Sequence, residues 1–329
     1  MRKNFFIIIL MVIGLNYPSG IGFSDWGATK RVTWNSGDSN WPAIAIDSNN
    51  NLHLVWCDYT PSNWEIYYKK STDGGSSWGT KRLTWTSGSS QEPAIAIDSN
   101  NNLHVVWHDL TPGNREIYYK RSIDEGSTWS AKRLTWNSGE SYCPAIAIDS
   151  NNNLHVVWED STPGNSEIYY KRSMDGGSTW SATKRLTWNS GLSYWPAIAI
   201  DSNNNLHVVW SDSTPGNSEI YYKRSMDGGS TWSATKRLTW NSGNSYYPAI
   251  AIDSNTNLHV VWYDHTPGNW EIYYKRSIDG GSTWSTKRLS STSGDSYCPA
   301  IAIDSNNNLH VVWEDSTPGN FEIYYKKGT

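Results

Sequence analysis

Eight side chains in this sequence could serve acid/base chemistry or bind a charged ligand, and they are not copied into every repeat of the chain. They are Glu92, His108, Arg115, Glu140, Glu159, Tyr263, His265 and Glu314. Hydrolysis at one site needs two or three groups in different roles, in environments that separate their pKa values. Side chains that recur identically in each repeat cannot provide such different roles. The eight exceptions form no recognisable acid/base set in the sequence, which therefore predicts no catalytic residue.

The elements that must position these side chains belong to a repeated unit. The unit restarts at six prolines, at intervals of 51 or 52 residues: Pro42, Pro93, Pro144, Pro196, Pro248 and Pro299. A fixed period of this length indicates a repeat architecture, in which each unit buries its faces against its neighbours.

One unit is expected to form four short strands. In the copy that begins at Pro196 these strands cover residues 197–200, 206–210, 220–225 and 236–240, separated by turn segments rich in Asp, Asn, Gly and Pro. No stretch of ten or more residues carries a helical period. Four strands in a repeat of about 50 residues are typical of a β-propeller blade. The sequence therefore predicts an all-β fold, a six-bladed β-propeller with four antiparallel strands per blade.

The two ends of the chain together predict how the ring closes. The last copy stops after its third strand, at residues 322–327, and residues 26–34 (WGATKRVTW) match the fourth strand of another copy, residues 232–240 (WSATKRLTW). The N-terminal strand is therefore expected to complete the last blade, which removes free sheet edges. The propeller domain is predicted to cover residues 24–329.

The first 23 residues are predicted to be a signal peptide. Arg2 and Lys3 precede an apolar run, residues 5–15, that is short for a transmembrane helix. The sequence thus predicts a secreted, periplasmic or cell-surface protein without a membrane span in the mature chain, and an uncleaved anchor is the alternative. The net charge of −4 and the even spread of Lys and Arg argue against a nucleic-acid partner. One large domain and a monomer are expected.

The composition is unusual in its 21 Trp and 20 Tyr residues. Part of this excess is expected to pack between blades, namely the Trp that recurs in the second strand: Trp56, Trp107, Trp158, Trp210, Trp262 and Trp313. Three cysteines leave two possibilities, free thiols or a disulfide between Cys57 and Cys298 on neighbouring blades. Cys143 and Cys298 lie in blades three apart and are expected on opposite sides of the ring.

No metal or cofactor is predicted. A histidine recurs in the second strand of every repeat, but positions related by sixfold symmetry away from the axis are too far apart to share an ion. The repeated DSNNN turns begin like a calcium loop, as at Asp149, but lack the glycine and glutamate that such a loop needs. We expect them to be plain Asx turns.

Residues 173–180 (SMDGGSTW) resemble the Asp box of bacterial neuraminidase repeats, S-x-D-x-G-x-T-W, which is found in sialidases and related propellers. Five copies begin at Ser71, Ser122, Ser173, Ser225 and Ser277. The resemblance implies a six-bladed propeller of the sialidase-like superfamily. In that family the Asp box is a structural turn between the third and fourth strands, away from the active site. The resemblance thus implies structural roles for Asp73, Asp124, Asp175, Asp227 and Asp279.

Sialidase activity is not implied as directly. That family binds the sialate carboxylate with three arginines, one of which comes from an F/Y-R-I-P motif just before a first strand. The residues before the repeat prolines are here Trp41, Glu92, Cys143, Trp195, Tyr247 and Cys298, and none is arginine. An arginine guanidinium binds a carboxylate through two parallel hydrogen bonds, and these side chains cannot replace it. Repeated arginines such as Arg185 and Arg237 are expected in solvated or inter-blade pairs, with Glu167 and Glu219 as candidate partners.

Differences between the copies point to a binding face. The blades that begin at Pro144 and Pro196 differ in three positions: Glu159/Ser211, Leu192/Asn244 and Trp195/Tyr247. All three lie in two loops, one between the second and third strands and one that leads into the next blade. Alternating strand directions place both loops on one face of the ring, opposite the Asp box. Variable loops on a rigid scaffold are where binding residues concentrate.

Aromatic side chains gather in these two loops. The predicted ligand-binding residues are Trp41, Trp64, Arg115, Tyr142, Tyr194, Trp195, Tyr246, Tyr247, Trp270, Tyr297 and Phe321. Flat rings beside Asn, Asp and Glu suit sugars, which offer apolar C–H faces and hydroxyl edges. Such rings could instead only pack the loops. The sequence favours a non-catalytic propeller that binds carbohydrate or another extracellular ligand such as a protein. An exo-sialidase or related glycoside hydrolase, or a protein-interaction scaffold, are the alternatives.

Overall fold

The computed structural model of the chain describes residues 30–60, 62–317 and 319–328, so the predicted signal peptide lies outside the described residues. The first three blades comprise β1 (Ser39–Ile46), β2 (Leu52–Asp58), β3 (Glu65–Ser71), β4 (Gly79–Arg82); β5 (Ser90–Ile97), β6 (Leu103–Asp109), β7 (Glu116–Ser122), β8 (Ser130–Arg133); and β9 (Ser141–Ile148), β10 (Leu154–Asp160), β11 (Glu167–Ser173), β12 (Lys184–Arg185). The other three comprise β13 (Ser193–Ile200), β14 (Leu206–Asp212), β15 (Glu219–Ser225), β16 (Lys236–Arg237); β17 (Ser245–Ile252), β18 (Leu258–Asp264), β19 (Glu271–Ser277), β20 (Ser285–Arg288); and β21 (Ser296–Ile303), β22 (Leu309–Asp315), β23 (Glu322–Gly328).

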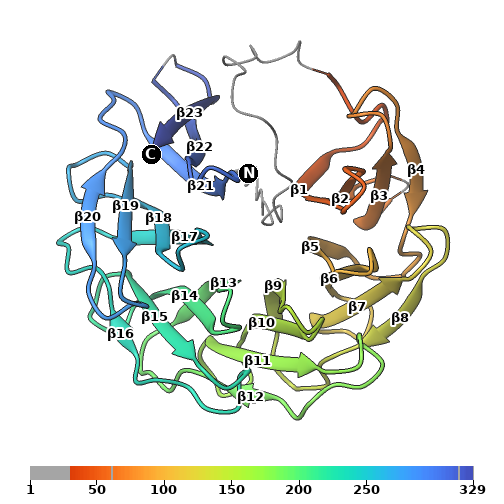
Figure 1. Cartoon of the computed structure of the whole chain (residues 1–329), viewed down its shortest axis with the longest axis horizontal. Helices are drawn as coiled ribbons and strands as arrows, with labels where there is room; N and C mark the ends of the chain where they lie inside the picture. Colours follow the sequence, from red (N-terminus) through yellow and green to blue (C-terminus); the bar gives the residue numbers. More distant parts are fainter. Residues whose placement is uncertain (1–29, 61, 318, 329) are drawn as a thin grey trace.

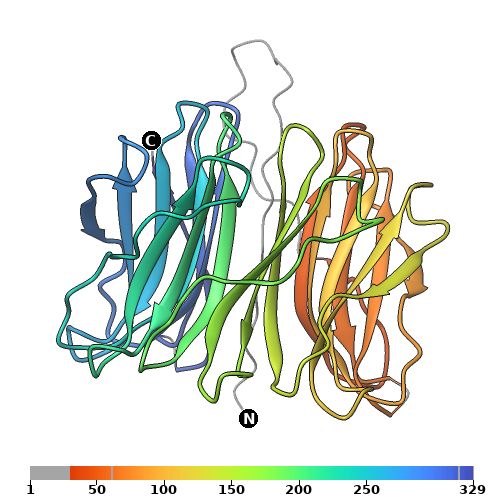
Figure 2. The same ribbon diagram turned by 90° about the horizontal axis from the view of Figure 1, so that it is seen from below.

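These strands form six antiparallel sheets, each ordered in the sheet as in the sequence, and the sheets follow one another around a ring (Figure 1). The first strand of each sheet lies nearest the ring axis, and from the first sheet to the sixth these inner strands contact one another in succession. Seen from the side, the strands run between the two faces of the ring (Figure 2). Within the described residues there is no helix, and hence none long and apolar enough to cross a membrane. The prediction of an all-β six-bladed propeller is confirmed.

The hydrophobic core lies between blades. In the first interface, Val55 and Ile66 of one blade pack with Leu103, Val105 and Trp107 of the next. The recurring second-strand tryptophans are all buried, with exposed fractions of 0 to 6%. Five of them, all but Trp56, pack in clusters between blades, as the sequence predicts. Burial of such large rings is a major favourable term in holding one sheet against the next.

Strand boundaries differ from the prediction at both edges of a blade. β13 begins at Ser193, four residues earlier than expected, because a bulge between Tyr194 and Ala197 carries the strand past Pro196. β16 has only two residues, Lys236 and Arg237. Beyond Arg237 the pairing becomes irregular: the Leu238 amide still donates to the Ile220 carbonyl at 2.7 Å, but the Ile220 amide donates to the Thr239 hydroxyl at 2.8 Å instead of to a backbone carbonyl.

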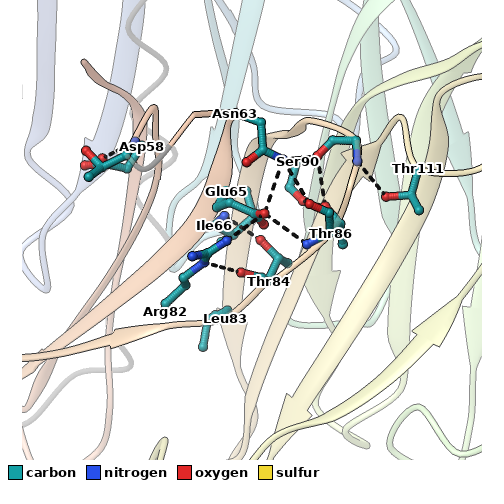
Figure 3. A network of polar contacts seen from close by, with 12 residues as sticks. Asp58, Asn63, Glu65, Ile66, Arg82, Leu83, Thr84, Thr86, Ser90 and Thr111 are labelled. Atoms are coloured by element: carbon teal, nitrogen blue, oxygen red, sulfur yellow. Dashed lines mark hydrogen bonds and ion pairs between the residues drawn. The ribbon is translucent and has the colours of Figure 1, made fainter. Parts of the chain in front are cut away.

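In five of the six blades, a buried glutamate at the start of the third strand holds the outer edge of the sheet. In the first blade the carboxylate of Glu65 accepts from Arg82 at 2.9 Å and from the Thr86 amide at 2.9 Å (Figure 3). Equivalent bonds join Arg185 to Glu167 at 2.8 Å and Arg237 to Glu219 at 2.9 Å. The predicted partners are therefore correct, and of the two predicted kinds of pair, solvated or inter-blade, neither fits fully, because each pair joins the third and fourth strands of one blade and its glutamate is buried.

The turns on the face opposite the variable loops are held by their own acidic side chains. In the Asp-box turn, Asp175 accepts from the Thr179 amide at 2.8 Å and from its hydroxyl at 2.6 Å. In a DSNNN turn, Asp201 Oδ1 accepts from the amides of Asn203 and Asn205 at 2.9 Å each, as in an Asx turn. These carboxylates are engaged within their turns.

The recurring histidines lie inside the blades. The Nδ1 atom of His207 is 2.8 Å from the hydroxyl of Tyr222, and its Nε2 atom is 3.4 Å from Asp201. The Tyr222 hydroxyl also donates to the carbonyl of Gly280 in the next blade at 3.3 Å. In the first four blades the histidine thus links a turn of its own blade to a tyrosine that contacts the next blade.

The predicted ring closure is present in part. Residues 26–29 of the closing segment lie outside the described residues, but Val32 accepts a hydrogen bond from Lys69 of the first blade, as Leu134 does from Lys171. The segment thus packs on the first blade where an outer strand would. Among the described residues, however, β23 pairs only with β22, and Ile323 is 65% exposed whereas Ile272, its counterpart in the fifth blade, is fully buried.

Candidate functional site

The six residues that precede the repeat prolines share an unusual backbone conformation. Each has a φ between 46° and 54°, and they are Trp41, Glu92, Cys143, Trp195, Tyr247 and Cys298. Such a left-handed conformation is costly for large side chains and is disfavoured before proline. The inner-strand bulges hold these residues in it. Strained positions of this kind cluster at functional sites.

All six residues line one cavity at the centre of the ring, with a volume of about 110 Å³. Five of the six repeat prolines, all but Pro42, and alanine and isoleucine residues of the inner strands complete its wall. Because every blade contributes a different part of the wall, the cavity has two tryptophans, one tyrosine, one glutamate and two cysteines in place of sixfold symmetry. None of the described residues that line it is a lysine or arginine.

One side of the cavity carries a carboxylate with two close partners. Glu92 Oε2 lies 3.3 Å from His108 Nδ1 and accepts from the Cys143 amide at 3.0 Å. Burial alone would raise the pKa of Glu92, but the charge of His108 and these two hydrogen-bonding partners hold it below its usual value. Glu92 is therefore ionised at neutral pH.

A second carboxyl group from the next blade behaves in the opposite way. Glu159 on β10 accepts from the Ser166 hydroxyl at 2.7 Å. Burial raises the pKa of Glu159 to about 7, and the charge of Glu92 contributes in the same direction. The two carboxyl groups thus have pKa values that are moved apart by their environments, an arrangement that suits one base and one acid.

The other side of the cavity is aromatic. The rings of Trp195 and Tyr247 stack with their centroids 3.7 Å apart and their planes 19° apart, and Tyr263 continues the stack at 5.6 Å from Tyr247. Trp270 packs against Tyr263 at 5.0 Å. The cluster extends over the last three blades, and its members are Tyr194, Trp195, Tyr246, Tyr247, Tyr263, Trp270, Tyr297 and Phe321.

The structure brings the eleven sequence-predicted binding residues together in three groups. Seven belong to the aromatic cluster: Tyr194, Trp195, Tyr246, Tyr247, Trp270, Tyr297 and Phe321. Trp41 and Trp64 pack edge to face at 6.0 Å in the first blade. Arg115 lies over Tyr142 at 5.1 Å and pairs with Glu140 at 3.0 Å. Of the eleven, Trp41, Trp195 and Tyr247 line the cavity.

Sequence reasoning did not place Glu92, Cys143 and Cys298 in the binding site, although each lines the cavity. The signal was present, because the pre-proline position changes from copy to copy while the proline is fixed. All three cysteines are free, and Cys143 and Cys298 line the same cavity although their blades are three apart. Burial raises the pKa of both thiols, to about 12 for Cys298, so neither is a reactive thiolate.

Metal ligation has no support in the part of the chain that the structure describes, where no group of three or more His, Cys, Asp or Glu side chains could hold an ion. The candidate site is therefore a central cavity with one carboxylate wall and one aromatic wall. Such a site can stack a flat apolar surface and exchange hydrogen bonds with hydroxyl groups through Glu92, whereas Glu159 is not among the residues that line the cavity.

Three comparisons with known proteins agree with this architecture. A family model described as a BNR repeat-like domain matches residues 21–260. Xyloglucanase Xgh74A from Acetivibrio thermocellus is 26% identical over 267 residues, covering 69% of this chain and 29% of the enzyme. The chain thus spans less than a third of that relative's length.

Solved structures show the same fold at low identity. An α-L-arabinofuranosidase from Fusarium graminearum superposes with a TM-score of 0.65 at 15% identity, covering 88% of this chain and 92% of the other. The intramolecular trans-sialidase from Ruminococcus gnavus superposes with a TM-score of 0.62 at 12% identity, covering 88% and 94%.

Proposed function

The chain belongs to the family of BNR repeat-like domains, and from this premise we propose that it is a carbohydrate-binding propeller whose primary site is the central cavity. The observation that carries the proposal is the aromatic wall, where Trp195 and Tyr247 stack at the axis beside the polar side chain of Glu92. Similar proteins that act on glycans, among them the xyloglucanase and the arabinofuranosidase, support the ligand class. A ligand outside the cell fits the predicted signal peptide.

The charge of the cavity favours a neutral sugar. A sialic or uronic acid carries a carboxylate that would lie beside ionised Glu92, and no cation among the described lining residues would offset the repulsion. A neutral sugar meets no such cost, because its hydroxyl groups can donate to Glu92 while its C–H face lies on an aromatic ring.

A glycan array probed with the full chain tests this proposal, with sialylated and desialylated forms of each glycan side by side. We expect retention on neutral glycans and a loss of about tenfold in affinity in Trp195→Ala, the effect of removing about 1.4 kcal/mol of stacking. Met174→Ala, which alters an exposed residue of an Asp-box turn, is the matched control and should bind normally. Absence of retention on every glycan, or equal binding by Trp195→Ala, would overturn the proposal.

A second candidate function, hydrolysis of a neutral glycoside, is favoured by the two carboxyl groups alone. In this mechanism Glu92 acts as the base or nucleophile and Glu159 as the acid, because the pKa of Glu92 is lowered and that of Glu159 is raised to about 7. Aryl glycosides of arabinofuranose and glucose provide the assay. Turnover that falls at least a hundredfold in both Glu92→Gln and Glu159→Gln would establish the enzyme, whereas binding without turnover leaves the non-catalytic propeller.

A further inference from the structure

A second kind of surface recurs around the outside of the ring. The tryptophan that follows each outer strand is exposed in five places, by 66 to 68% of its surface, at Trp34, Trp85, Trp136, Trp188 and Trp240. The second-strand tryptophans, by contrast, are buried. Five large aromatic surfaces left in water at regular intervals indicate a binding role, because exposed apolar patches of this kind often mark interaction sites.

One of these rings forms the wall of a groove of about 250 Å³ between the second and third blades. Trp136 and Asn137 contribute to the groove from the end of the second blade, and Asp160, Thr162 and Lys171 from the third. Asn137 Oδ1 is buried and has no hydrogen-bond partner among the described residues. A buried acceptor without a donor is uncommon in proteins, and a ligand hydroxyl would satisfy it.

The exposed ring is nevertheless held in place. Arg133 and Lys171 lie over Trp136, with the guanidinium carbon 5.6 Å and the ammonium nitrogen 5.7 Å from the ring centroid. Arg133 is fixed by Glu116 at 2.9 Å and Lys171 by the Leu134 carbonyl at 2.6 Å. Cation–π contacts from two anchored side chains reduce the conformational freedom that a ligand would otherwise have to remove.

The same arrangement recurs at other interfaces. Lysine nitrogens lie 5.5 Å from the ring of Trp34, 5.8 Å from that of Trp85 and 5.5 Å from that of Trp188. The interface between the fifth and sixth blades differs, because Ser291 occupies the tryptophan position. The chain therefore contains five exposed rings and one natural position without a ring.

We propose that these rim grooves are carbohydrate subsites that stack the apolar face of a neutral sugar on each tryptophan, so that one propeller binds several points of a polysaccharide. The proposal takes its ligand class from the proposed function but concerns different residues on the outside of the ring. A neutral polymer is the occupant because Arg133 and Lys171 are already engaged within the protein, and Asp160 adds negative charge to the groove. Several weak subsites on one rigid ring gain affinity for a repeating ligand through avidity.

Affinity electrophoresis of the full chain in gels that contain hydroxyethyl cellulose, a neutral glucan, tests the inference. We expect the parent protein to be retarded, Trp136→Ala to bind about threefold more weakly and the Trp136→Ala/Trp188→Ala double variant about tenfold more weakly, since fewer subsites remain. Ser291→Trp should strengthen retardation, which keeps the test valid if a deletion variant folds poorly. Met174→Ala removes an equally exposed apolar side chain, 68% exposed, from an Asp-box turn, and the retardation of this variant should equal that of the parent protein.

The outcomes separate this inference from the proposed function. Retardation that survives Trp195→Ala but falls in Trp136→Ala supports the rim grooves. Retardation that falls only in Trp195→Ala overturns the rim inference and leaves the central site. A parent protein that migrates freely in the glucan gel overturns the rim inference, and the glycan array then reports on the central cavity independently.

Discussion

Replacing Glu167 with Gln tests whether buried carboxylates hold the outer strands. Glu167 is fully buried and accepts from Arg185 at 2.8 Å, from the Asn189 amide at 2.8 Å and from the Asn165 side chain at 3.2 Å. A glutamine oxygen can still accept from an amide, but the charge that pairs with Arg185 is lost. Breaking a fully buried ion pair costs about 3 to 5 kcal/mol, and because the Arg185 side chain is 25% exposed we expect a smaller cost of about 2 to 3 kcal/mol.

Urea unfolding followed by tryptophan fluorescence measures this cost. With a denaturant slope of about 3 kcal/mol/M, the midpoint of Glu167→Gln should fall by roughly 0.7 to 1 M. Glu125→Gln is the control, since Glu125 is a surface residue whose side chain is 55% exposed and whose pair with Lys70 should contribute under about 1 kcal/mol. A midpoint for Glu167→Gln that lies within 0.2 M of the control would refute the reasoning.

Further predictions concern closure and pH. Glu322 is the counterpart of Glu167 in the sixth blade, where β23 pairs only with β22, so Glu322→Gln should leave the urea midpoint unchanged. A drop in the midpoint like that of Glu167→Gln would instead show that Arg31 pairs with Glu322 and closes the ring. The folded state raises the pKa of Glu159 from 4.5 to about 7, so the stability of the parent protein should fall as pH rises from 4.5 through 7. Glu159→Gln should therefore be more stable to urea than the parent at pH 8, with little difference at pH 5. Burial lowers the pKa of His53, His104 and His259 from 6.5, so the unfolded chain binds more protons and the urea midpoint should decline as pH falls below about 6.5.

Local sequence patterns predicted the blade because each strand is bounded by strong turn signals. The outer strand was overestimated for a physical reason: residues 236–240 alternate as a strand should, but the Thr239 hydroxyl takes the bond that a backbone carbonyl would have accepted. The start of the inner strand was underestimated because proline lacks an amide hydrogen. The bulge at Tyr194 lets the strand continue through Pro196 all the same.

The aromatic face could be predicted, but the central site could not. Residues before proline are normally extended, which gives no reason to expect Glu92, Cys143 and Trp195 to line one cavity at the axis. Their left-handed conformation depends on the bulge, and the bulge depends on pairing with the second strand. The separation of the Glu92 and Glu159 pKa values likewise depends on burial and on His108, which belongs to a different strand from either carboxylate.

The lysine contact between blades has a consequence for the history of the chain. Lys171 donates to Leu134, Lys223 to Leu186 and Lys326 to Leu289, so several interfaces use the same bond to the preceding blade, whereas Lys275 of the fifth blade donates to Thr286 of its own blade. This bond does not by itself identify which blade stands on either side, whereas the contacts near the axis do, such as those of Glu92 with Cys143 and of Trp195 with Tyr247. Unequal recombination between near-identical repeats would therefore delete or add a whole blade and could keep this bond at the new junction. Selection on blade number must then act through the fit of the whole ring and through the residues at its axis, which differ from blade to blade.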